Sequence, residues 1–257
     1  MTSLVDVESR GRIAVVRLRR EEKLNALSTA VERALQDALG DNRVTRSACV
    51  VVTGGARAFS AGADVTQMRD LDPAAILAYY RETGDVYEKV AALPQPTMAA
   101  IAGHCLGGGF ELALACDFRV ADTTASFGLP EVGIGIIPSS GGTHRLARLV
   151  GTARAKELAL LRDRFGPAEA RDLGLVTEMV PEGRALERAL ELAERLAALP
   201  PLAVTLTKQA IDAMPEASRE AGLALERVAY GLLAQTEDAR EAASAFAEKR
   251  EPRFRGR

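Results

Sequence analysis

GHCLGGGFE, residues 103–111, is the stretch around which the rest of this chain can be interpreted. It follows a short apolar run, TMAAI at 97–101, which is typical of a buried strand, and it leads into an apolar helix predicted from about Gly108 to Cys116. Successive glycines at a strand-to-helix junction are entropically costly. One use for them is to bring free N–H groups of the first helical turn close to a ligand, where the helix dipole favours negative charge.

Two nucleotide-binding motifs are alternatives for this stretch, and both are disfavoured. A phosphate-binding loop requires GxxxxGK[ST], and no lysine follows these glycines. A dinucleotide-binding loop requires GxGxxG/A after the first strand. Here Leu112 stands where the last small residue is needed, and the stretch lies late in the chain.

Strands and helices alternate on both sides of this stretch. Apolar, β-branched runs predict strands at 13–18 and 49–53, and a helix is expected between them at 29–39, with Thr29 and Glu32 as a possible capping box. Residues 65–93 are predicted to be mostly helical, with breaks near 72–73 and at Gly84, and a strand follows at about 117–120. From about Thr152 the chain is predicted to be mainly helical, with a short strand at 175–180. The βαβ order indicates an α/β protein.

Composition excludes several classes of protein. The chain has 257 residues, 47% hydrophobic and 26% charged, and these are ordinary globular values. A net charge of -2 disfavours nucleic-acid and anionic-membrane partners. Three cysteines without a CxxC pair favour a reducing cytoplasm, and two histidines are too few for a His-rich metal site. We expect no signal peptide and no membrane span.

A second loop of small residues, AFSAGAD at 58–64, follows the strand at 49–53. Small side chains allow a ligand to approach the backbone, and ligands of α/β sheets bind at the carboxyl ends of the strands. A plain strand-to-helix turn explains the composition of this loop equally well.

Two glutamates stand in apolar, glycine-rich surroundings. Glu111 lies in the first turn of a helix that is apolar on all sides, and Glu131 is the one charged residue within 127–142. A buried carboxyl has a raised pKa, which suits a group that exchanges a proton near neutral pH. The alternative for Glu111 is a surface glutamate that stabilises the helix dipole, and for Glu131 it is a first-turn position after Pro130.

Taken together and in order, these segments resemble the enoyl-CoA hydratase/isomerase (crotonase) family, and most closely an enoyl-CoA hydratase. The resemblance spans nearly the whole chain, and the ordered combination of motifs is far more specific than any one of them. The matching segments are KLNAL at 23–27, AFSAGAD at 58–64, GGGFELA at 107–113, Pro130-Glu131 with Gly135, Pro138 and GGT at 141–143, and FAEKREPRF at 246–254.

The resemblance implies a crotonase-like spiral of repeated ββα units in residues 1–195. It also implies a helical C-terminal oligomerisation region in 196–257, which would support a homotrimer or a hexamer built as a dimer of trimers. Helical runs with broad apolar faces in the last part of the chain agree with this, because such faces need a cover.

The resemblance also assigns roles to residues. The N–H groups of Ala63 and Gly108 would form an oxyanion hole for the thioester oxygen, and Glu111 and Glu131 would be the catalytic pair. No metal or redox cofactor is implied, and coenzyme A enters as part of the acyl-CoA substrate. The resemblance implies that Lys249 or Arg250 of a neighbouring subunit also contacts the coenzyme A moiety. The residues implied to bind that moiety are Lys23, Leu24, Ala26, Ala61, Asp64, Gly107 and Lys249.

Both glutamates are retained, which favours hydration of a 2-enoyl-CoA to a 3-hydroxyacyl-CoA. Isomerisation, hydrolysis or retro-Claisen cleavage on the same scaffold is the near alternative, and a non-catalytic RNA-binding member is the distant one. His144 stands where many hydratases have glutamine, and we expect a surface position for it. Ile76, Tyr79 and Tyr80 are candidates to line the acyl pocket, with core packing as the default.

Overall fold

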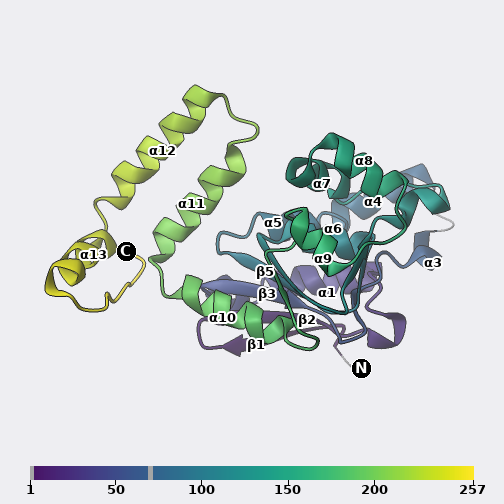
Figure 1. The fold of residues 1–257 in the computed structure, drawn as a ribbon, viewed down its shortest axis with the longest axis horizontal. Helices are drawn as coiled ribbons and strands as arrows, with labels where there is room; N and C mark the ends of the chain where they lie inside the picture. Colours follow the sequence, from purple (N-terminus) through teal and green to yellow (C-terminus); the bar gives the residue numbers. More distant parts are fainter. Residues whose placement is uncertain (1–2, 69–71) are drawn as a thin grey trace.

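The structure is a computed structural model that describes residues 3–68 and 72–257 (Figure 1). Its strands form two sheets. The larger sheet has the order β1 (Val5–Arg10), β2 (Ile13–Leu18), β3 (Cys49–Thr53), β5 (Thr97–Ile101), β7 (Phe118–Asp122) and β9 (Glu178–Val180). The smaller sheet has the order β4 (Ala58–Ser60), β6 (His104–Leu106) and β8 (Ser126–Gly128).

The chain repeats one structural unit as it proceeds. β3 is followed by β4, β5 by β6 and β7 by β8, so that each unit adds one parallel strand to each sheet. Helices follow each pair: α3 (Val65–Met68), α4 (Pro73–Glu82) and α5 (Val86–Ala91) after β4, α6 (Gly108–Ala115) after β6, and the 3-10 helix η2 (Pro130–Ile134) after β8. This confirms the α/β spiral of repeated ββα units.

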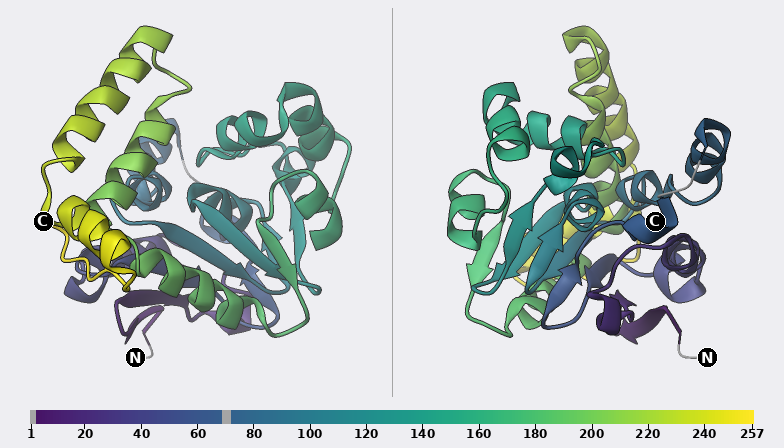
Figure 2. Two further views of the ribbon diagram at one scale, coloured as in Figure 1. Left: turned by 60° about the vertical axis from the view of Figure 1, so that its left-hand side comes forward. Right: turned by 90° about the vertical axis from the view of Figure 1, so that its right-hand side faces the viewer.

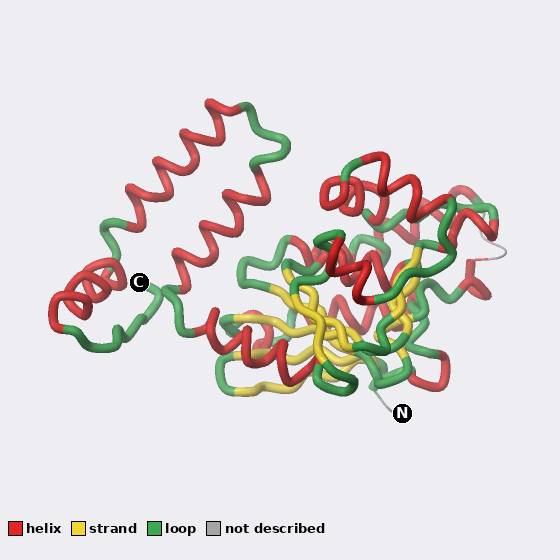
Figure 3. The backbone as a smooth tube through the Cα atoms, in the orientation of Figure 1, coloured by secondary structure: helices red, strands yellow, loops and turns green. Residues whose placement is uncertain are grey.

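The larger sheet is buried on both faces, as the continuous apolar run at 49–53 predicts. Val50 and Val52 point into the main core, whereas Cys49 and Val51 point to the opposite face. There they meet the alanine stripe of α10 (Ala185–Ala197). Small alanine side chains allow this helix to lie close against the strands, and Figure 3 shows α10 alongside the yellow sheet.

The remaining helices complete the molecule. Near the N-terminal half lie η1 (Glu21–Lys23), α1 (Thr29–Leu39) and α2 (Asn42–Thr45). After η2 come α7 (Gly142–Val150), α8 (Thr152–Leu160) and α9 (Pro167–Asp172), and after α10 come α11 (Pro201–Ala213), α12 (Arg219–Leu233) and α13 (Glu237–Glu248).

The C-terminal helices stand away from the sheets. In both views of Figure 2 the α11–α12 hairpin rises from the strands. Gly222 is the one buried residue of α12. Large apolar side chains on α11–α13 are therefore exposed in a single chain: Leu202, Ile211, Leu225, Val228, Tyr230, Leu232 and Phe246. The division into 1–195 and 196–257 remains a prediction, and α10 ends at Ala197, just beyond that boundary.

Two local expectations were wrong. Ser28, not Thr29, caps α1, since its Oγ accepts from the N–H of Val31, and Glu32 turns inward instead of closing a capping box. None of the residues of α4 is buried, so Ile76, Tyr79 and Tyr80 are not core residues. Among the described helices, none is long and apolar enough to cross a membrane.

Candidate active site

Three loops meet because β4, β6 and β8 are neighbouring parallel strands. Each strand lies at the start of one of the segments that the sequence singles out, namely 58–64, 103–111 and 127–142. Parallel strands present their carboxyl ends at one edge of a sheet, where ligands of α/β proteins bind. Segments distant in sequence thus form one candidate site.

Ala63 and Gly108 lie together with free N–H groups. Leu27, in the strip at 24–27, donates its N–H to the carbonyl of Gly62 and accepts from the N–H of Asp64. The N–H of Ala63, which lies between those two residues, takes no part in this pairing. Gly108 opens α6, so its N–H has no intrahelical partner. Within residues 3–68 and 72–257, neither N–H donates to a backbone acceptor.

Glycines are required where these two loops touch. Gly62 has φ +97°, and a Cβ there would lie 2.8 Å from the carbonyl oxygen of Leu106 and 3.3 Å from the nitrogen of Gly108. Gly107 has φ +50° and ψ −128°, a backbone conformation that side chains disfavour. The glycines therefore allow the close approach of two unpaired N–H groups, as an oxyanion hole needs.

Glu111 is held as a hydrogen-bond acceptor. Its side chain is buried on α6, and its Oε1 accepts from the N–H groups of Ser140 and Gly142, each at 2.8 Å. A Cβ on Gly142 would lie 2.7 Å from that oxygen. Burial raises the pKa of Glu111, while the two N–H donors and the positive charge of Arg145 oppose the rise. The two donors favour the ionised form.

Glu131 is also buried, and among the described residues it is its own backbone N–H that opposes the effect of burial on its pKa. It lies on η2 beside Gly107, because a Cβ on Gly107 would lie 2.7 Å from Glu131 Oε1. Its Oε2 is buried and has no hydrogen-bond partner among the described residues. Burial, and secondarily the charge of Glu111, raise the pKa of Glu131 to about 7. This carboxyl is thus poised between its neutral and ionised forms near neutral pH.

The predicted coenzyme A strip lies beside the same loop. The N–H of Ala61 donates to the carbonyl of Leu24 at 2.9 Å, and Arg20 bridges the carbonyl of Ala26, at 3.2 Å, and the carboxylate of Asp64, at 2.7 Å. The turn that includes Lys23 continues into left-handed backbone at Leu24 and at the residue after it. The structure therefore joins 23–27 to 61–64.

Asn25 fixes this strip, a role that the sequence analysis did not assign to it although it lies within KLNAL at 23–27. It is 1% exposed and has φ +54°, its Oδ1 accepts from the N–H of Arg20, and its Nδ2 donates to the carbonyl of Ala58. Asparagine tolerates left-handed backbone better than most residues, which is the signal that its position in a short turn offered.

Lys249 and His144 lie outside this group. Lys249 ends α13, and Figure 1 draws that helix on the opposite side of the molecule from α3, so one chain does not bring Lys249 to the loops. His144 is exposed on α7, with Nε2 3.2 Å from Nη1 of Arg148, which agrees with the expected surface position.

A third buried glutamate, Glu32, was not foreseen. Its Oε1 accepts from the hydroxyl of Tyr79 at 2.6 Å and from that of Tyr87 at 3.1 Å, and burial raises the pKa of its carboxyl. A Cβ on Gly108 would lie 3.1 Å from the Tyr87 hydroxyl, so this cluster lies directly behind the first turn of α6. In the sequence, Glu32 looks like an ordinary glutamate near a helix N-terminus.

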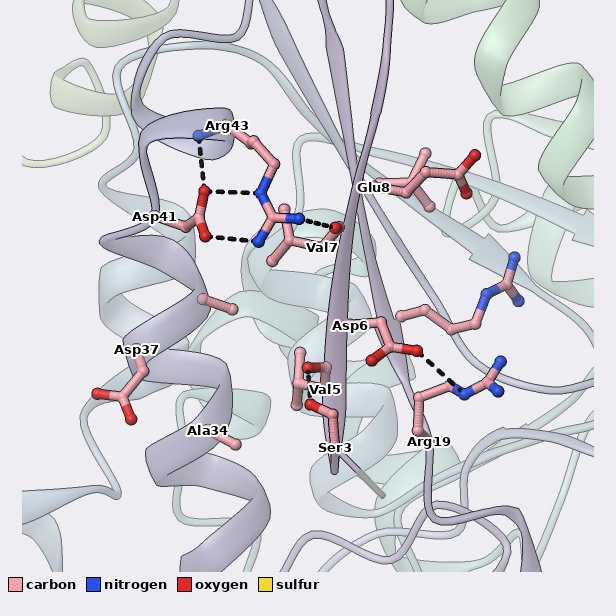
Figure 4. A pocket seen from close by; sticks show the side chains of 13 residues that line it. Ser3, Val5, Asp6, Val7, Glu8, Arg19, Ala34, Asp37, Asp41 and Arg43 are labelled. Atoms are coloured by element: carbon pink, nitrogen blue, oxygen red, sulfur yellow. Dashed lines mark hydrogen bonds and ion pairs between the residues drawn. The ribbon is translucent and has the colours of Figure 1, made fainter. Parts of the chain in front are cut away.

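A separate hollow of about 650 Å³ lies between β1 and α1 (Figure 4). Its charges are largely paired within the wall, Arg43 with Asp41 and Arg19 with Asp6. Neither of the two candidate glutamates lines it. The site is therefore defined by the three loops and not by this hollow.

Comparison with known proteins gives one consistent result. The family model described as enoyl-CoA hydratase/isomerase matches residues 8–257. The chain belongs to the enoyl-CoA hydratase/isomerase family. Among curated relatives, 2,3-dehydroadipyl-CoA hydratase of Escherichia coli is 41% identical over 100% of both chains. An enoyl-CoA isomerase/hydratase of Mycosarcoma maydis is 42% identical over 77% of this chain and 73% of its own.

Solved structures of this family superpose closely on the chain. A crystal structure of enoyl-CoA hydratase from Bacillus anthracis has a TM-score of 0.92 and 39% identity, and covers 99% of this chain and 100% of its own. The spiral fold implied by the sequence is that of the family.

Proposed function

We propose that this protein is an enoyl-CoA hydratase, which adds water across the 2,3 double bond of a 2-enoyl-CoA thioester to give a 3-hydroxyacyl-CoA. The observation that carries this proposal is the pairing of two buried glutamates in unlike surroundings with two free backbone N–H groups. Hydration needs one base, one acid and one site for a negatively charged oxygen, and this group of residues supplies all three.

The N–H groups of Ala63 and Gly108 donate hydrogen bonds to the thioester oxygen. Attack of water at C3 shifts electrons from the double bond onto this oxygen, giving an enolate. Each donor stabilises that charge by about 3 kcal/mol, as in comparable sites, and the N-terminus of α6 adds its dipole.

The two carboxyls divide the proton transfers. Glu111, whose N–H donors favour the ionised form, takes a proton from water as the hydroxide adds to C3. Glu131, whose Oε2 has no donor and whose pKa is about 7, gives its proton to C2 as the enolate collapses. One proton is gained and one lost by the pair, so its total charge is the same before and after the reaction.

The substrate's coenzyme A moiety is proposed to run along 23–26 and 61–64, past Gly107. A neighbouring subunit would supply Lys249, which is exposed at the end of α13, whereas Arg250 is already paired with Glu241 and Glu248. The exposed apolar side chains of α11–α13 support assembly into a homotrimer or a hexamer. The proposed compartment is the cytoplasm, since the cysteines are free and buried.

Isomerisation of the double bond is the second candidate, because the relative from Mycosarcoma maydis carries both activities in its name. Presence of both Glu111 and Glu131 supports hydration over isomerisation, which one acid can perform. A non-catalytic RNA-binding role has less support, given the net charge of -2.

Turnover of crotonyl-CoA tests the proposal. The absorbance of the conjugated thioester should disappear, and a panel of longer 2-enoyl-CoAs together with 2,3-dehydroadipyl-CoA, for which the Escherichia coli relative is named, would rank the acyl groups. No turnover of any member at saturating concentration would refute the hydratase assignment.

A further inference from the structure

Arg145 on α7 is a largely buried cation that the chemistry above leaves unused. Its side chain is 14% exposed, although an arginine usually reaches solvent. Its Nη1 donates to the carbonyl oxygen of Ser140 at 3.0 Å, and its Nη2 donates to Oε1 of Glu88 on α5 at 2.6 Å. The planar guanidinium serves its two partners through a rigid fork of donors, whereas a lysine would reach them with one ammonium on a flexible stem.

Ser140 connects Arg145 to Glu111. The carbonyl of Ser140 accepts from Arg145, while its N–H donates to Glu111 Oε1. The same short segment supplies the second donor, the N–H of Gly142. Arg145 therefore grips, from the far side, the backbone segment that holds the Glu111 carboxylate.

Arg145 also acts on Glu111 through its charge. Among the described residues, it is the cation whose charge lowers the pKa of Glu111 against the effect of burial. The other titratable groups facing Glu111 are Glu131 on η2, Tyr79 on α4 and Tyr87 on α5. Behind them, Glu32 on α1 accepts from both tyrosines, and Glu88 pairs with Arg145 itself, so within residues 3–68 and 72–257 Arg145 is the cation that favours the ionised form of Glu111.

We propose that Arg145 is a positioning residue for the hydration reaction. By holding the Ser140 carbonyl and Glu88, it fixes segment 139–142 and orients the Glu111 carboxylate toward the attacking water. The inference rests on the proposed function, in which Glu111 is the base.

The test uses Arg145→Gln, Arg145→Lys and Glu88→Gln in the full-length protein, with Arg148→Gln as the matched control. Arg148 lies on the same helix but contacts His144 and Glu216 instead. We expect Arg145→Gln to lower kcat for crotonyl-CoA about tenfold or more with KM within about twofold, because a displaced base affects the chemical step. The acidic limb of its kcat/KM profile should move up by about half a pH unit or more, because the carboxylate loses its cation.

The variants separate the effect of the hydrogen bonds of Arg145 from the effect of its charge. Arg145→Lys should leave the acidic limb near its wild-type position yet still lower kcat, since it keeps the charge and loses the two-armed contact. Glu88→Gln should lower kcat less than either. Hydrogen-exchange mass spectrometry provides a readout independent of turnover. The amides of 139–142 should exchange faster than in the wild type in both Arg145 variants, and at the wild-type rate in Arg148→Gln.

Three results would overturn the inference. They are an unmoved acidic limb in Arg145→Gln, unchanged exchange of 139–142, or losses equal to those of Arg148→Gln. If Arg145→Gln does not fold, Arg145→Lys and Glu88→Gln decide the matter through exchange and kcat. A wild-type protein without hydratase turnover would refute the proposed function instead, and the exchange data would still report whether Arg145 holds the segment.

Discussion

Glu111 and Glu131 are two residues of one chemical type, buried to similar extents, and their surroundings differ. Glu111 is 3% exposed and accepts from two backbone N–H groups beside a cation. Glu131 is 8% exposed, and its Oε2 accepts from no group among the described residues. Burial raises both pKa values. At Glu111 the N–H groups of Gly142 and Ser140 and the charge of Arg145 oppose this rise, whereas at Glu131 its own backbone N–H opposes it. In the proposed mechanism the surroundings, and not the residue type, therefore make Glu111 the base and Glu131 the acid.

The largest expected effect comes from removing either carboxyl. Glu111→Gln and Glu131→Gln should each lower kcat for a 2-enoyl-CoA by about 10²–10⁴-fold, because a glutamine neither takes nor gives the proton. Steady-state kinetics with circular dichroism as a folding control would measure this. Near-normal activity in either variant would remove that residue from the proposed pair.

A smaller loss is expected when Glu111 is pushed rather than removed. In Gly142→Ala the new Cβ would start 2.7 Å from Glu111 Oε1, so the carboxylate must shift, and kcat should fall about tenfold to a hundredfold. Gly166→Ala is the control, because a Cβ there would meet no atom within 4 Å. Equal activity of the two variants would mean that the position of Glu111 is not critical.

The pH profile distinguishes the two glutamates without a mutation. Glu131 must be protonated to act as the acid, and its pKa is about 7, so kcat/KM should fall by about tenfold per unit as the pH rises above 7. Rates measured from pH 5 to pH 9 in buffers of constant ionic strength test this. A flat profile up to pH 9 would show that Glu131 is not the proton donor.

The last expected effect is on stability and not on rate. The pKa of Glu131 rises from 4.5 to about 7 on folding, so the folded protein holds this proton more tightly. That contribution is complete below about pH 4.5 and is lost as the pH rises through about 7. Glu131→Gln lacks it, and its free energy of unfolding relative to wild type should therefore increase between pH 5 and pH 8, by at most about 3 kcal/mol. Denaturant unfolding at one protein concentration measures the difference, and a pH-independent difference would contradict the assigned surroundings.

Strands with long apolar runs were predictable from the sequence, and very short ones were not. Residues 49–53 and 97–101 are apolar on both faces, and the structure has strands at these positions. β4, β6 and β8 have three residues each, too few to show a period, so only the repeated ββα units implied by the family resemblance indicated these strands. The first strand, Val5–Arg10, was missed because its alternation of apolar and charged residues includes only two apolar positions, Val5 and Val7, too few to show a period.

The loops of the site were predictable because successive glycines cost conformational entropy on folding and therefore indicate a specific use. Gly62, Gly107 and Gly142 each stand where a Cβ would strike a neighbouring loop or carboxyl. Partners brought together by the fold left no trace in local sequence. Glu32 accepts from the hydroxyls of Tyr79 and Tyr87, and Arg145 on α7 donates to Glu88. In both networks the partners lie far apart in the sequence, so no motif of fixed spacing indicates them.

The most direct test of this account is the identity of the product that the wild-type protein forms from crotonyl-CoA. Mass spectrometry of the thioester should show the gain of one water, and the gain should be lost in both Glu111→Gln and Glu131→Gln. An unchanged mass with a moved double bond, or release of free coenzyme A, would contradict the assignment of one glutamate as base for water and the other as acid for C2.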